Sequence, residues 1–149
     1  MLKNYTSSVS VSRSIAHIEE SLASHGAQSV IKQYSSEKKP MISFFMKIKS
    51  RDELIPFRLP VKVKQVEMIL RSNMKRSSPV ALKKLEEQSE RTAWKIISDW
   101  IDAQMAMVEL NQAELEEIFL PYMWNEKVGQ SFFQVLAEKG FNLLEAPKK

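Results

Sequence analysis

The sequence predicts one domain of the α+β class, and three observations lead to this prediction. The chain has 149 residues, which is the length of a typical single domain. Its apolar fraction of 44% and charged fraction of 27% are those of a globular protein rather than of a disordered chain. Apolar residues recur with a period of two between residues 27 and 59, and with a helical period on either side of that segment. We therefore expect an α-βββ-α half with an antiparallel sheet in residues 1–77, followed by an all-helical half in residues 78–149.

The first helix is expected over residues 10–25. Four apolar residues recur on one face at spacings of four, three and four, namely Val11, Ile15, Ile18 and Leu22. Ser10 or Ser12 is the expected N-cap, and Gly26 stands where a glycine often ends a helix. Residues 6–9 are expected to form a short strand before it.

Three strands are expected next, over residues 27–34, 41–49 and 54–59. The second has the clearest alternation in the chain, with Ile42, Phe44, Met46 and Ile48 on one face and Phe45, Lys47 and Lys49 on the other. Pro56 has no N–H to donate to a neighbouring strand, so the third strand is expected at an edge of the sheet or to end early.

Helices are expected in the rest of the chain. One runs from Pro60 to about Asn73 with Val63, Val66, Ile69 and Leu70 inward. Ser78 and Pro79 then form a strong start for a helix that nothing interrupts before about Leu110. At 1.5 Å per residue, about 30 residues span about 45 Å, so this helix either breaks once or projects and packs against a partner. Self-association through it is expected.

The C-terminal segment has two further helix signals. Asn111 with Glu114 has the pattern of a capping box, which starts a helix that Pro121 limits. Residues 131–144 are expected to form a short helix ended by Gly140 and then an extended apolar piece, with the last four residues frayed.

Charge is divided unequally along the chain. Residues 1–79 hold 14 Lys/Arg and 6 Asp/Glu, a net charge of +8, whereas residues 80–149 hold 8 and 12, a net charge of −4. The excess arises within residues 32–76, the predicted strands and the helix after them. A basic face that also carries aromatic rings suits nucleic acid, because cations neutralise phosphates while bases stack on the rings. The candidate residues are Lys32, Tyr34, Phe45, Lys47, Lys49, Arg58, Lys62 and Lys64, provided that Lys32 and Tyr34 share the face of Phe45 and Lys47. The alternative is a solvated sheet face whose lysines guard an edge against aggregation.

The long helix carries two further sets of candidate residues. The first is a partner-binding stripe made of Arg91, Trp94, Lys95 and Trp100, for which the alternative is packing in the core. The second is the carboxylates Asp99, Asp102 and Glu109, which are expected to form a solvated acidic face because no histidine is near them in the sequence. The only histidines, His17 and His25, are expected at the surface and too far apart to share a metal.

Several classes of function lack their usual sequence signals. There is no cysteine, so disulfides, thiolate nucleophiles and cysteine-based zinc sites are excluded. No glycine-rich phosphate loop or catalytic motif occurs, so we expect a protein that is not an enzyme and has no metal and no cofactor. The N-terminus has no apolar signal segment, and no stretch of 18 apolar residues suggests a membrane span, so a cytoplasmic protein without a membrane partner is expected.

Several stretches resemble a family of small phage and prophage proteins. These are SVSVSRSIAHIEESLASHGA, IPFRLP, ERTAWKIISDWIDAQMAMVE and EEIFLPYM, and the similarity covers roughly residues 5–145. The resemblance implies a mobile-element origin, in the cytoplasm of a host cell, and brings no established activity. The α-βββ-α order is also similar to the core of the single-strand annealing proteins.

Three functions follow as hypotheses. The first is a non-enzymatic accessory protein of a phage or mobile element that binds nucleic acid through a basic sheet face, either alone or as an oligomer. The second is an anti-defence inhibitor that binds a host protein through the acidic helical half. The third is a component of virions or their assembly.

Overall fold

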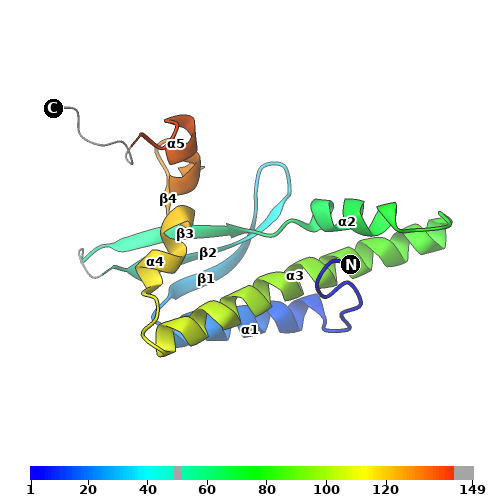
Figure 1. Ribbon diagram of the computed structural model, residues 1–149, viewed down its shortest axis with the longest axis horizontal. Helices are drawn as coiled ribbons and strands as arrows, with labels where there is room; N and C mark the ends of the chain where they lie inside the picture. The colour runs from blue at the N-terminus through cyan, green and yellow to red at the C-terminus, as the bar shows by residue number, and fades with distance from the viewer. Residues whose placement is uncertain (49–51, 143–149) are drawn as a thin grey trace.

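The structure, a computed structural model, describes residues 1–48 and 52–142 and has an α+β fold (Figure 1). In chain order the elements are α1 (Val11–Ser24), β1 (Gln28–Tyr34), β2 (Pro40–Lys47), β3 (Leu54–Pro60), α2 (Val63–Ser72), α3 (Pro79–Glu109), α4 (Leu115–Phe119), the 3-10 helix η1 (Leu120–Tyr122), β4 (Trp124–Asn125), β5 (Gln130–Ser131) and α5 (Phe132–Glu138). The first helix is confirmed with Ser10 as its N-cap, and Gly26 follows it with a positive φ of 100°.

The predicted sheet is confirmed as three antiparallel strands in the order β1-β2-β3. β3 is an edge strand, as Pro56 predicts, and Pro56 lies opposite Phe45 of β2. β3 continues through Pro60, so the prediction that Pro60 begins a helix is wrong. The next helix, α2, begins at Val63.

The core lies between one face of this sheet and the helices α1 and α3, and we call that face the inner face (Figure 1). Ile42, Phe44 and Met46 of β2 are at most 2% exposed there. The rings of Phe44 and Phe57 stack at 5.4 Å, and Phe119 of α4 meets Phe44 edge-on at 5.1 Å. Paired aromatic rings of this kind add about 0.5–1.5 kcal/mol beyond the area they bury.

The long helix α3 is continuous over 31 residues, and it has two partners. Its C-terminal part packs beside α1, and its N-terminal part packs beside α2. The second pair of helices projects beyond the sheet (Figure 1). We call this projection the arm, made of α2, residues 73–78 and residues 79–89 of α3. The excess length of α3 is therefore used within the chain, against α2.

The C-terminal half is not all-helical, which corrects the prediction. β4 and β5 form a small two-stranded sheet, and Met123 just before it bridges to Phe57 on the free edge of β3. The helix start near residue 111 is also shifted. The amide of Glu114 donates to Glu117, whereas Asn111 has a φ of 57° beyond the end of α3.

The N-terminal segment lies along α3 instead of forming the strand expected over residues 6–9. Thr92 Oγ1 donates to the carbonyl of Asn4 at 2.9 Å, and Gln88 Nε2 donates to the carbonyl of Ser7 at 3.1 Å. These bonds satisfy polar groups that β pairing would otherwise have used.

Candidate nucleic-acid interface

The strand register divides the candidate residues between the two faces of the sheet. Residues directly opposite in an antiparallel pair project to the same face. Lys32 lies opposite the buried Ile42, so Lys32 and Tyr34, two residues on, belong to the inner face. Phe45 and Lys47 belong to the outer face. The condition that these four residues share one face is therefore not met.

On the outer face, both described cations among the candidates already have partners. Lys47 Nζ lies 3.1 Å from Asp52, and Arg58 lies 3.5 Å from Glu126. The Arg58 guanidinium also stacks 4.2 Å from the centre of the Trp124 ring. Trp124 was not among the predicted candidates, because strands of two residues show no periodicity in a sequence. Lys49 lies outside the described residues.

On the inner side, the remaining candidates meet in a hollow that we call the groove. It has a volume of about 560 Å³ and lies between the β1–β2 hairpin, the start of α2 and the arm side of α3. Residues that line it include Lys32, Tyr34, Lys38, Lys39, Lys62, Lys64 and Trp94, together with Glu37, Glu67, Glu86 and Glu90. The predicted set Lys32, Tyr34, Lys62 and Lys64 is thus brought together, although not with Phe45, Lys47 or Arg58.

Two aromatic rings flank the ammonium group of Lys32 in the groove. Lys32 Nζ lies 5.1 Å from the centre of the Tyr34 ring and 5.3 Å from that of Trp94. Trp94 is 1% exposed, whereas Tyr34 is 61% exposed. A cation above an aromatic face contributes about 0.5–2 kcal/mol, so Lys32 is fixed between a buried ring and an open one.

The lysines of the groove differ in their partners. Lys39 pairs with Glu37 at 2.7 Å, and Lys64 pairs with Glu67 at 3.6 Å. The hydrogen bond and the charge of Lys39 lower the pKa of the Glu37 carboxyl, against a small effect of burial. Within residues 1–48 and 52–142, no carboxylate pairs with Lys32, Lys38 or Lys62. Three ammonium groups are therefore available to an external anion.

The predicted partner-binding stripe is used inside the molecule. The prediction is wrong for Trp94, because its ring is buried between α3 and the sheet. Trp100 packs edge-on against Phe119 at 6.1 Å and Tyr122 at 5.8 Å. Arg91 donates to Gln88, and Lys95 pairs with Asp99 at 2.9 Å. The alternative interpretation, packing, is the one that the contacts favour.

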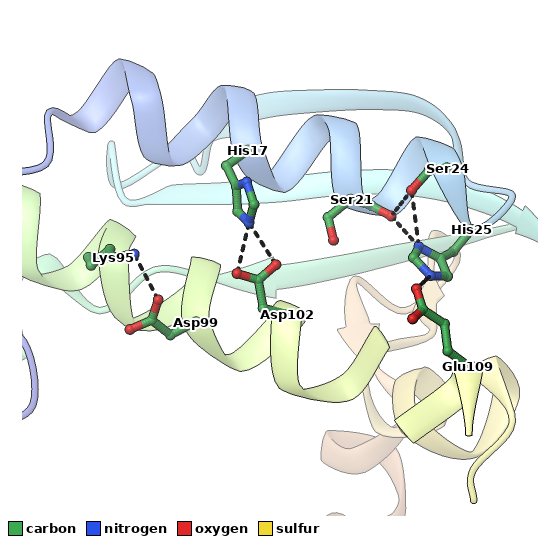
Figure 2. Close-up of polar contacts among 8 residues, drawn as sticks. All are labelled: His17, Ser21, Ser24, His25, Lys95, Asp99, Asp102 and Glu109. Atoms are coloured by element: carbon green, nitrogen blue, oxygen red, sulfur yellow. Dashed lines mark hydrogen bonds and ion pairs between the residues drawn. The ribbon is translucent and has the colours of Figure 1, made fainter. Parts of the chain in front are cut away.

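The carboxylates of α3 do have histidines beside them, which corrects the expectation from the sequence. Figure 2 shows His17 of α1 directed at Asp102, with Nε2 at 2.7 and 2.8 Å from the two carboxylate oxygens. His25 Nε2 lies 3.0 Å from Glu109 in the same view. α1 and α3 run parallel, so two histidines eight residues apart along α1 and its C-cap meet two carboxylates seven residues apart on α3. These pairs join two helices, and no group of three or more metal-ligating side chains occurs in the described parts of the chain.

Asp99, one turn before Asp102, has the most connected carboxylate on α3. Burial by itself raises the pKa of Asp99, but hydrogen bonds from Asn4 and Lys95 and the charges of Lys95 and Lys3 outweigh it. The pKa therefore lies below its ordinary value, and the ionised carboxylate fastens the N-terminal segment to α3.

The chain has no match among known proteins that assigns this groove a role. No family model, no curated protein and no solved structure matches it. In the described residues, no helix is long and apolar enough to cross a membrane.

Proposed function

We propose that this protein binds single-stranded nucleic acid and that one nucleotide of the strand occupies the groove. The observation that carries the proposal is the exposed ring of Tyr34 beside the unpaired ammonium groups of Lys32, Lys38 and Lys62. The groove volume of about 560 Å³ is within the range of about 300–1,000 Å³ for ligand pockets.

The mixed charge of the groove favours a single strand over a duplex. Its lining holds five lysines and four glutamates, which is a weak attraction for a bare polyanion. An unstacked nucleotide offers more than phosphate, because its amino groups donate to carboxylates and its face stacks on an aromatic ring. In a duplex the base faces are stacked on one another and are not available to Tyr34.

The outer sheet face is the weaker alternative. Its described cations, Lys47 and Arg58, are each paired with a carboxylate, and Arg58 is also stacked on Trp124. Binding phosphate there requires those contacts to break. This difference gives an internal control, because Lys47 is a strand lysine on the face opposite Lys32.

Titration of labelled single-stranded and double-stranded oligonucleotides at low and at physiological salt tests the proposal. Tyr34→Ala is expected to weaken single-strand binding by roughly 5- to 140-fold, because stacking contributes about 1–3 kcal/mol per base. Lys62→Glu is expected to weaken single-strand binding by a factor that grows as the salt concentration falls, whereas Lys47→Glu is expected to leave binding unchanged. Absence of binding at low salt refutes the proposal. Equal losses for Lys47→Glu and Lys62→Glu, with both variants folded by circular dichroism, refute the assignment to the groove.

A further inference from the structure

The tip of the arm carries a cluster of positive charge. We define the tip as residues 71–84, the end of α2, the connecting loop and the start of α3. These 14 residues include five cations and no Asp or Glu: Arg71, Lys75, Arg76, Lys83 and Lys84. All five side chains are exposed, and within residues 1–48 and 52–142 none of them pairs with a carboxylate.

The backbone at the tip adds to this positive charge. α3 begins there, with Ser78 as its N-cap, whose Oγ accepts from the amide of Ala81 at 3.1 Å. The N-terminal end of a long helix behaves as about half a positive charge, which favours anions near it. The arm projects from the rest of the molecule, so this end lies away from the sheet (Figure 1).

The groove lies at the base of the arm, where α2 begins, and the tip lies at the other end of α2. Pro79 at the start of α3 lies about 11 residues along the helix from Glu90, which lines the groove together with Glu86. At 1.5 Å per residue this is about 17 Å. A stacked strand advances about 3.4 Å per nucleotide, so about five nucleotides span the interval.

We propose that the tip is a second phosphate-binding site for the same strand, which runs from the groove along the arm. This inference rests on the proposed function of the groove. The groove then holds a base, and the tip binds the sugar-phosphate backbone several nucleotides away. Most of the salt dependence of binding arises at the tip, since the groove lining is almost neutral in charge.

An anionic membrane is the other partner with phosphate on its surface, and the tip fits it less well. Membrane-surface segments combine Lys/Arg with a face of Trp, Phe or Leu that enters the lipid. The tip has no aromatic residue, and Val80 is its only large apolar side chain that is more than about a third exposed. Binding the phosphates of a nucleic acid requires only the cations.

The test compares a tetranucleotide and a hexadecanucleotide of deoxyadenylate, since the first fills only the groove and the second reaches the tip. The tip variant carries Lys75→Gln and Arg76→Gln, which change the loop and leave both helices intact. A control variant with Lys127→Gln and Lys139→Gln removes the same charge from exposed positions elsewhere. The tip variant is expected to weaken hexadecanucleotide binding and to lower its salt slope by about 1.4, with tetranucleotide binding unchanged.

Three outcomes contradict the inference or its premise in distinguishable ways. Unchanged hexadecanucleotide affinity and salt slope in the tip variant overturn the second site while the groove stands. If the tip variant loses hexadecanucleotide binding but Tyr34→Ala changes the binding of neither oligonucleotide, the groove is not a binding site and no strand runs from it to the tip. Binding to vesicles containing phosphatidylserine that only the tip variant loses, with nucleic-acid binding intact, overturns the inference in favour of a membrane contact.

Discussion

Phe119 is expected to be the residue that holds the C-terminal segment to the sheet. It lies at the end of α4, a helix of five residues, and is 0% exposed. Its ring meets those of Phe44 at 5.1 Å, Trp100 at 6.1 Å and Phe57 at 6.2 Å. A helix this short is not stable by itself, so its position depends on this contact. Phe119→Ala removes the ring and leaves a cavity between β2, β3 and α3.

The expected loss of stability is about 3–5 kcal/mol. This is the usual range for replacing a buried Phe by Ala, because the apolar transfer term and the cavity add. For 149 residues at about 0.05–0.15 kcal/mol per residue, the free energy of unfolding is about 7–22 kcal/mol. The variant is therefore expected to stay folded in its sheet and arm, with residues 115–142 opening at a lower free energy than the rest.

Urea denaturation and amide hydrogen exchange measure these two effects. Phe133→Ala is the matched control, because Phe133 lies in the same C-terminal segment but is 54% exposed and contacts only the ring of Phe141 among the aromatic residues described. It is expected to cost less than about 1 kcal/mol. Similar losses for the two variants, or faster exchange in α1 as well as in residues 115–142 of Phe119→Ala, contradict the reasoning.

Three further predictions concern the helix interface. Ser14→Ala is expected to leave stability unchanged or to raise it by up to about 1 kcal/mol, because Ser14 Oγ is buried without a hydrogen-bond partner in the described structure. Ser89→Ala is expected to cost about 0.5–1.5 kcal/mol, since Ser89 Oγ donates to the carbonyl of Leu85. Urea denaturation measures both changes in the free energy of unfolding. Asp99→Asn is expected to lower stability near pH 7 and to lose this effect in acid. The pKa of Asp99 is depressed in the folded state, so the stability that its carboxylate contributes is present above the unfolded pKa of about 3.9 and disappears as pH falls through the folded pKa. A loss of stability in Asp99→Asn that stays constant with pH contradicts this. A double-mutant cycle between His17 and Asp102 is expected to give a coupling below about 1 kcal/mol, because both side chains are about half exposed.

Element order was largely predictable because local patterns encode it. The period of two in residues 41–49 and the N-cap with Pro79 each identify an element without any knowledge of its neighbours. Pairing across the sheet is not encoded in this way. β1 has a register irregularity between Gln28 and Ile31, and Ser29 there has a φ of 51°. Such a bulge changes which residues share a face, so the side of Lys32 and Tyr34 could not be read from alternation.

The candidate site was predicted in part for the same reason. The basic and aromatic residue types of the groove were identified, but their separation from Phe45 and Lys47 depends on the register. The approach of His17 to Asp102 depends on α1 and α3 being parallel neighbours, which residues 85 apart in sequence do not reveal. The return of residues 123–131 to the edge of β3 was equally hidden, since strands of two residues have no repeating pattern.

The continuity of α3 makes the length of the arm an adjustable dimension. Its C-terminal part is fixed in the core beside α1, while its first turns and α2 contact mainly each other. Removal of one helical turn from both α2 and the start of α3 therefore shortens the arm by about 5.4 Å without removing any strand of the sheet. The arm can therefore change in length by whole turns while the rest of the fold keeps its position.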